Sequence, residues 1–184
     1  MKCLAISGSV RKGSTNTALL EAVARLAAPD IDITLYDGIQ SLPIFSPDLG
    51  DENTPQIVLD FAAQVGEADG LIFSSPEYVH SLPGGLKNAI DWLVPRLELV
   101  DKPVALIHAS HRGDLMLDTL RDVLQTVTGN YDEENFLRFN LMNLSPPEIF
   151  ETLSKPDNAD QIRQFLNRLN CYIQQRKNPQ KAGF

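Results

Sequence analysis

The sequence predicts an α/β protein in which a five-stranded parallel sheet is doubly wound, with helices on both faces in a three-layer arrangement. Short apolar runs alternate with amphipathic helical patterns along most of the chain. The runs are apolar at successive positions, which is typical of strands buried on both faces of a parallel sheet. Right-handed crossovers then place the intervening helices on the two faces, and 184 residues are enough for one such domain.

The amino-terminal third of the chain supplies two strands and two helices. Residues 2–7 form an apolar run, and residues 15–27 follow with apolar side chains at helical spacing. A second strand is expected over residues 31–36. Residues 40–53 are rich in Pro, Ser and Asp, which predicts a loop. A threonine that can cap a helix and a proline suited to its first position then predict a helix over residues 55–66.

The middle of the chain continues the alternation. Residues 70–74 form a short apolar strand, and residues 83–94 show a helical pattern that begins with a proline. Residues 103–109 are a second largely apolar run, and residues 114–128 carry apolar side chains along one helical face. A fifth strand is expected over residues 136–142.

A closing helix over residues 157–174 completes the pattern, so that residues 1–175 form one domain and residues 176–184 a polar C-terminal tail. Five strands in a chain of this length favour the flavodoxin-like strand order 2-1-3-4-5. In that order a ligand binds at the carboxyl ends of the first and third strands. The two most unusual loops of the sequence follow those two strands.

The charge balance and the cysteines limit what the protein can bind and where it works. The formal net charge of −8 weighs against a nucleic-acid binder and against binding to an anionic membrane surface. The first apolar run is too short for a signal peptide, and no run is long enough to span a membrane. Cys3 and Cys171 form no C-x-x-C motif, which favours free thiols in a reducing cytoplasm. The histidines and cysteines lack metal-ligand spacing, so no metal is expected, and His108 is expected to be a hydrogen-bonded core residue.

The loop after the first strand has the composition of a phosphate site. Residues 4–20 read LAISGSVRKGSTNTALL, so a strand ends in a turn rich in hydroxyl and basic side chains and a helix begins. Unpaired N–H groups and the dipole at a helix N-terminus favour an anion, and hydroxyls, an amide and a guanidinium can complete the site. The loop has neither the G-x-G-x-x-G pattern nor the P-loop pattern. Other phosphate-bearing ligands remain, of which a flavin mononucleotide is the obvious one.

The loop after the third strand suits a flat ring. It begins SSPEYVHSLPGG at Ser74. Pro76 turns the chain away from the strand, and Pro83 suits the start of the next helix. Between the prolines, a short irregular segment with Glu77 and Tyr78 exposes backbone polar groups and one aromatic face. A heteroaromatic ring with polar edges requires such a wall.

Together the two loops resemble those of the NAD(P)H-dependent FMN reductases, a family that includes quinone- and chromate-reducing members. The likeness rests on GSVRKGSTNTALL in the first loop and PEYVHSLPGGLKNAIDWL in the second. It implies that the FMN phosphate is held by Ser9, Arg11, Ser14, Asn16 and Thr17. It also implies that the isoalloxazine ring is lined by Pro76, Glu77 and Tyr78, with Val79 and His80 completing the loop.

The chain departs from the family pattern at two places. Family members often carry Asn at the position of Val79. The loop after the fourth strand is usually rich in paired glycines and approaches the pyrimidine end of the flavin, whereas here it reads ASHRGDLML. The resemblance therefore places Ser110, His111 and Arg112 at the flavin, where these bulkier side chains contact its carbonyls or narrow the site.

The implied reaction is hydride transfer from NADPH or NADH to flavin N5 and on to a small-molecule acceptor, which can be a quinone, a flavin, an azo compound or a metal oxyanion. The flavin supplies the chemistry, so no dedicated catalytic residue is expected. Relatives of this kind are homodimers or homotetramers. Two alternatives stay open: a flavodoxin-type electron carrier without a nicotinamide site, and a cofactor-poor interaction protein of the same fold.

Overall fold

The computed structural model describes residues 1–27 and 29–177. One sheet runs through the molecule, and every neighbouring pair of its five strands is parallel, in the order β2-β1-β3-β4-β5. The predicted doubly wound order is therefore confirmed. The strands are β1 (Lys2–Ser7), β2 (Asp32–Tyr36), β3 (Gly70–Ser74), β4 (Val104–His108) and β5 (Tyr131–Arg138).

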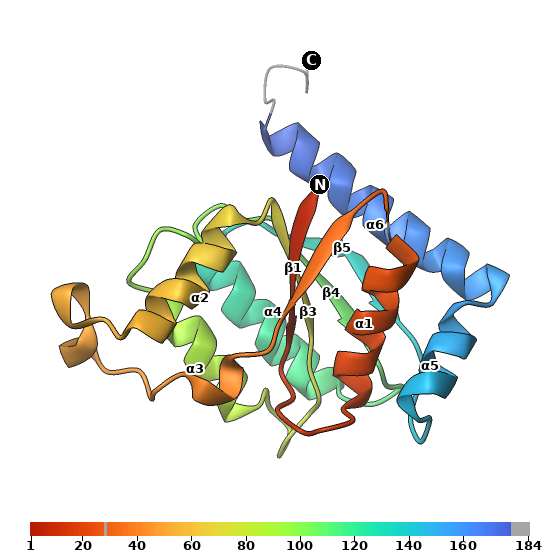
Figure 1. The fold of residues 1–184 in the computed structure, drawn as a ribbon, viewed down its shortest axis with the longest axis horizontal. Coiled ribbons are helices and arrows are strands. Elements are labelled where there is room, and N and C mark those ends of the chain that lie inside the picture. Colours follow the sequence, from red (N-terminus) through yellow and green to blue (C-terminus); the bar gives the residue numbers. More distant parts are fainter. Residues whose placement is uncertain (28, 178–184) are drawn as a thin grey trace.

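Helices cover both faces of this sheet (Figure 1). One face carries α2, α3 and α4, and the other carries α1, α5 and α6. The helices are α1 (Thr15–Ala27), α2 (Gln56–Glu67), α3 (Gly84–Leu93), α4 (Asp114–Thr128), α5 (Pro146–Leu153) and α6 (Pro156–Lys177). Among the described residues, no helix combines the length and the apolar character that crossing a membrane requires.

Side chains alternate between two apolar cores along each central strand. In β3, Leu71 and Phe73 belong to the core shared with α2, α3 and α4, whereas Ile72 belongs to the core shared with α1 and α6. All three side chains are buried. Burial on both faces is the reason that the central strands are continuous apolar runs rather than alternating ones.

The fifth strand differs from its prediction. It spans Tyr131–Arg138, whereas residues 136–142 were expected from their apolar character. The sheet order makes β5 an edge strand, and Glu133 and Glu134 on it are exposed. Charged side chains are common on edges, where they discourage pairing with another chain. A search for apolar runs therefore misses the first half of this strand.

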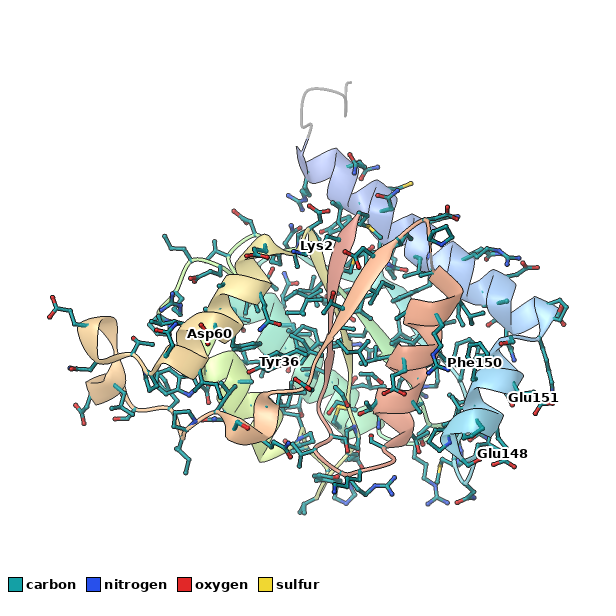
Figure 2. All side chains as sticks on the ribbon, in the orientation of Figure 1. Lys2, Tyr36, Asp60, Glu148, Phe150 and Glu151 are labelled. Carbon is teal, nitrogen blue, oxygen red and sulfur yellow. The ribbon has the colours of Figure 1, made fainter. Side chains whose placement is uncertain are left out.

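The helix α5 is missing from the prediction, although its start has a readable signal. The carboxylate of Glu148 accepts a 2.8 Å hydrogen bond from the Ser145 N–H, and the two residues form a capping box. Phe150, on the same helix, faces α1 (Figure 2), where the Arg25 guanidinium lies 5.4 Å from the centroid of its ring. Helix α5 covers one end of the apolar core that lies between the sheet and the helices α1 and α6.

Three smaller differences concern element ends and loops. A loop was expected over residues 40–53, and three short 3₁₀ turns lie in or at the start of this segment: Ile39–Ser41, Pro47–Leu49 and Asp51–Asn53. The helices α2 and α3 each begin one residue later than predicted, because Pro55 and Pro83 occupy the N-cap position. The predicted tail over residues 176–184 begins inside α6, and residues 178–184 lie outside the described residues. The domain boundary at residue 175 stays a prediction.

The register of β1 and β3 places their following loops side by side. Ser7 pairs with Ser74, and the Gly8 N–H donates a 2.8 Å hydrogen bond to the Ser74 carbonyl. A Cβ at Gly8 would lie 2.4 Å from the Ser75 Oγ and 2.9 Å from its Cβ, so this close approach requires glycine. Both loops therefore leave the same point of the carboxyl edge of the sheet.

Candidate functional site

A pocket of about 360 Å³ opens at the carboxyl edge of the sheet, between the loops that follow β1, β3 and β4. This is the switch point, where a doubly wound sheet binds its ligand. The structure brings nine of the predicted site residues to the wall of this pocket: Ser9, Arg11, Ser14, Asn16, Pro76, Glu77, Tyr78, Ser110 and Arg112. Four do not line it: Thr17, Val79, His80 and His111.

The loop after β1 presents unpaired N–H donors. Ser14 caps α1, because its Oγ accepts a hydrogen bond from the Thr17 N–H at 3.4 Å. The backbone N–H groups of Lys12, Gly13 and Thr15 have no hydrogen-bond partner among the described residues. Gly13 has a φ of +66°, which glycine adopts without strain. These donors, at the positive end of the α1 dipole, suit an anion.

Asn16 and Thr17 connect this loop to the ends of the strands. The Asn16 Oδ1 accepts a buried hydrogen bond of 2.9 Å from the Ser74 hydroxyl. Its Nδ2 has no partner among the residues that the structure describes, and Asn16 lines the pocket. Thr17 instead donates from its hydroxyl to the Ser7 Oγ at 2.8 Å. Asn16 therefore keeps a free donor for a ligand, whereas the Thr17 hydroxyl is used within the protein.

The loop after β3 forms a tight hairpin at its tip. Tyr78 and Ser81 exchange backbone hydrogen bonds of 3.0 and 3.1 Å, and the two residues between them, Val79 and His80, have φ angles of +52° and +59°. A two-residue turn with both φ angles positive favours Asn and Gly. A β-branched residue is strained in this conformation. The Val79 side chain is 96% exposed and lies away from the pocket, whereas Tyr78 lines it.

Glu77 links this loop to the helix α4. Its Oε2 accepts a hydrogen bond of 3.3 Å from the Met116 N–H in the first turn of α4. Its Oε1 lies 3.5 Å from the Nδ1 of His80. A carboxylate at a helix N-terminus is favoured by the helix dipole. Glu77 therefore lines the pocket and also fixes the position of the loop against α4.

Two hydrogen bonds hold the backbone of the loop after β4 in place. The Ser110 Oγ accepts a hydrogen bond of 3.0 Å from the Arg112 N–H, and the Arg112 carbonyl lies 2.6 Å from the Nε2 of His108. Gly113 follows with a φ of +98°, and a Cβ there would lie 3.0 Å from the same Nε2. His111 lies outside the pocket, with its Nδ1 3.1 Å from the Asn140 Oδ1. The Arg112 side chain is exposed at the pocket wall.

His108 is buried, as expected of a core histidine, but it also lines the pocket. Because a carbonyl can only accept, the contact with Arg112 places the ring proton on Nε2. The Nδ1 is buried and has no hydrogen bond to any described residue. Burial lowers the pKa of His108, and the Arg112 carbonyl opposes this only in part. The imidazole is therefore neutral at neutral pH.

Sequence reasoning missed several wall residues: Thr15, His108, Ala109, Gly113 and Met142. Their shared signal is position, because the carboxyl ends of all parallel strands meet at one edge of the sheet. Met142 follows β5, whose position was wrongly predicted. Its Sδ lies 3.2 Å from the Ser110 hydroxyl, so the segment after β5 closes one side of the pocket.

Two further features lie outside this site. A cavity of about 640 Å³ opens at the amino edge of the sheet, where Asp69 and Pro103 precede β3 and β4. It is separated from the carboxyl-edge loops by the length of the strands. No group of three or more His, Cys, Asp or Glu side chains that could hold a metal ion occurs in the described part of the chain.

The sequence is similar to known reductases over about three fifths of its length. A quinone reductase of Escherichia coli (strain K12) is 37% identical over 116 residues, which are 61% of either chain. An NAD(P)H-dependent FMN reductase of Pseudomonas aeruginosa is 41% identical over 112 residues, 60% of either chain. The chain thus spans about three fifths of the length of the curated relatives it matches.

Solved structures show the same fold over nearly the whole chain. The NAD(P)H:(acceptor) oxidoreductase FerB of Paracoccus denitrificans has a TM-score of 0.68 at 24% identity, with 95% of this chain and 96% of that one covered. An NADH:FMN oxidoreductase, EmoB, has a TM-score of 0.62 at 26% identity, with 91% and 87% covered. The sequence model of the NADPH-dependent FMN reductase family matches residues 1–134, which include every predicted site residue. The chain therefore belongs to the NADPH-dependent FMN reductase family.

Proposed function

We propose that this protein is an oxidoreductase that binds FMN in the carboxyl-edge pocket and transfers electrons from NADPH or NADH to a small-molecule acceptor such as a quinone, a flavin, an azo compound or a metal oxyanion. The observation that carries the proposal is that a loop rich in unpaired N–H donors and a loop with an aromatic wall share one pocket. In the overall reaction, one NAD(P)H, one proton from solvent and one quinone give one NAD(P)⁺ and one hydroquinone.

The residues present fit this cofactor. Free donors for a phosphate come from the Arg11 guanidinium, the Asn16 Nδ2 and the unpaired N–H groups of the loop after β1. Pro76 and Tyr78 offer apolar and aromatic surface for the ring. When bound, FMN would supply the redox chemistry of hydride transfer between the electron donor and the acceptor.

The protein side chains bind and position, and we assign none of them as an acid or base. Ser9 and Ser14 hold the phosphate loop in shape, and Ser110 holds the loop after β4. Thr17 supports the first loop from behind through Ser7. Val79, His80 and His111 lie outside the pocket and act, in this proposal, only through the shape of their loops.

Binding and reduction of FMN test the proposal with one matched pair of variants. Arg11 lines the pocket, whereas the neighbouring cation Lys12 does not. We expect Arg11→Gln to weaken FMN binding by about tenfold or more, because it removes a charge-assisted hydrogen bond. Lys12→Gln serves as the control and is expected to stay within about twofold. Riboflavin, which lacks the phosphate, is expected to bind weakly and equally to all three proteins.

The electron donor is tested by mixing the FMN-loaded protein with NADPH or NADH without oxygen. Rapid bleaching of the flavin absorbance, followed by its return on addition of a quinone, is the expected result. Reduction by dithionite but by neither nicotinamide would instead identify an electron carrier. A wild-type protein that takes up no FMN would overturn the proposal as a whole.

We also propose that the protein is a cytoplasmic homodimer or homotetramer. Its cysteines are free, which fits a reducing compartment. Ile44, in the segment before α2, is 85% exposed, and Val94 and Leu97, after α3, are 58% and 83% exposed. Large exposed apolar side chains close together indicate an interface. Light scattering after gel filtration tests this, and Leu97→Asp is expected to shift the protein toward the monomer.

A further inference from the structure

Two arginines on the wall of the pocket differ from all the other arginines of the chain. Each of the seven arginines outside the pocket contacts an acid, an amide or an aromatic ring. Arg96, Arg121, Arg138 and Arg163 pair with acids, Arg25 and Arg176 face aromatic rings, and Arg168 donates to Asn135. The guanidinium groups of Arg11 and Arg112 are exposed and have no partner within residues 1–27 and 29–177. In a chain of net charge −8, both unpaired guanidiniums therefore lie at one site.

The backbone of Arg112 is fixed while its side chain is free. Its N–H donates to the Ser110 Oγ at 3.0 Å, and its carbonyl accepts from His108 at 2.6 Å. Gly113, with its positive φ, allows the chain to turn directly into α4. The loop thus holds Arg112 at the pocket wall without using its guanidinium, which is the arrangement expected of a residue that binds a ligand.

No acid on the pocket wall neutralises these two cations. Glu77 is the only acidic residue there among the described residues. Its carboxylate is already engaged by the Met116 N–H at 3.3 Å and lies 3.5 Å from His80. Two guanidiniums and one engaged carboxylate leave the pocket wall with an excess of positive charge, which favours an anionic ligand.

The two cations lie on loops that β3 separates. Arg11 follows β1 and Arg112 follows β4, with β3 between those strands in the sheet. The loop after β1 has its own N–H donors, so a phosphate there needs no help from Arg112. A second anion would therefore be bound at the other side of the pocket, beside the ring rather than beside the phosphate.

We propose that Arg112 selects an electron acceptor that carries an anionic group, such as a carboxylate, a sulfonate or an ionised hydroxyl, on or next to its reducible ring. This inference rests on the proposed function. The guanidinium forms a charge-assisted hydrogen bond with that group and orients the acceptor over the ring of the cofactor. The stoichiometry of the reaction is the one given above, and Arg112 contributes only to binding of the acceptor.

The test compares two naphthoquinones, 2-methyl-1,4-naphthoquinone and 1,4-naphthoquinone-2-sulfonate, as acceptors for wild type, Arg112→Gln, Arg112→Lys and the control Arg163→Gln. Arg163 lies on α6, away from the pocket. We expect Arg112→Gln to lower the ratio of kcat/KM for the sulfonate to kcat/KM for the methyl compound about fivefold to tenfold. Arg112→Lys is expected to keep part of this preference, and Arg163→Gln all of it. In the wild-type protein, raising the salt concentration should reduce the preference for the sulfonate over the methyl compound, because salt screens the charge of Arg112. In Arg112→Gln the salt concentration should not change this preference.

A binding measurement separates the acceptor from the cofactor and the donor. Naphthalene-2-sulfonate, which is not reduced, should bind the FMN-loaded wild type about fivefold to tenfold more tightly than Arg112→Gln, with the dissociation constant of FMN changed less than threefold. An unchanged quinone ratio would overturn the inference. So would a large rise in the FMN dissociation constant, or slower flavin reduction by NADPH and NADH, since Arg112 would then serve the cofactor or the donor. Each of these outcomes would overturn the role of Arg112 and leave the proposed function intact. Only a wild-type protein that binds no FMN would overturn the proposed function itself.

Discussion

The hydroxyl of Ser74 donates a buried 2.9 Å hydrogen bond to the Oδ1 of Asn16, and this contact joins the end of β3 to the first turn of α1. It fixes the orientation of the Asn16 amide, because Oδ1 is used inside the protein and Nδ2 is left for the pocket. One side chain thereby couples the loop that follows β3 to the loop that precedes α1.

The variant Asn16→Asp separates these two roles of the side chain. A carboxylate still accepts from Ser74, so the fold is expected to remain intact. It has no donor for a phosphate and repels one, so FMN binding is expected to weaken by about tenfold or more. Isothermal titration with FMN, with thermal unfolding as a check on folding, measures both effects.

The control for this prediction is Ser74→Ala, which keeps the Asn16 amide but releases its oxygen. We expect it to cost stability of about 1 kcal/mol, the usual effect of losing one hydrogen bond, and to weaken FMN binding less than Asn16→Asp does. Unchanged FMN affinity in Asn16→Asp would show that this side chain makes no contact with the phosphate.

The strained tip of the β3 loop predicts a stabilising substitution. Val79 has a φ of +52° and is 96% exposed, so its side chain gains little from burial and suffers from its backbone conformation. Val79→Asn should raise the free energy of unfolding by about 1 kcal/mol, because Asn tolerates this region. Val79→Thr removes apolar surface without relieving the strain and is the control. Equal stability of the two variants in urea titrations would show that the strain is not the cause.

The same residue shows how far the sequence alone can lead. The strands and the two loops were predictable because they depend on local patterns, namely apolar runs and the residues at turns. The sheet order followed from the number of strands, since few doubly wound orders are common. The sequence marked Val79 as a departure from the family, but only the backbone angle explains why Asn suits that position. Thr17 was predicted to hold a phosphate, yet its hydroxyl bonds to Ser7, ten residues earlier. Such a choice of partner depends on the packing of the whole edge, which no local pattern records.

The contact between Glu77 and the first turn of α4 predicts a salt-dependent contribution to stability. Glu77→Gln keeps an oxygen acceptor for the Met116 N–H but removes the charge that the helix dipole favours. We expect a loss of about 0.5 kcal/mol at low salt, which decreases at 1 M NaCl. Urea titrations at the two salt concentrations measure it, with Glu134→Gln on the exposed edge of β5 as the control. A loss that does not change with salt would contradict the role of the dipole.

The two cysteines are expected to differ sharply in reactivity. Cys3 is 1% exposed, and burial raises its pKa to about 12, so its reactive thiolate form is scarce at pH 8. Cys171 is exposed on α6. Iodoacetamide at pH 8 should therefore modify only Cys171 in the folded protein and both cysteines in urea. Peptide mass spectrometry checks this. Labelling of Cys3 in native Cys171→Ser would contradict the prediction, because it would show that the amino-terminal end of β1 is accessible.

His108 predicts how stability changes with pH. Burial keeps its folded pKa below the ordinary value near 6.5, so the unfolded chain takes up a proton first as the pH falls. Stability is therefore lost on acidification below about pH 6.5, with a slope of at most about 1.4 kcal/mol per pH unit, until the pH reaches the folded pKa. In His108→Gln an amide can still donate to the Arg112 carbonyl, but nothing titrates at this position. Urea titrations at pH 7.5 and 5.5 should show a larger loss for wild type than for this variant. An equal loss in the two proteins would show that groups other than the buried His108 ring cause the pH dependence.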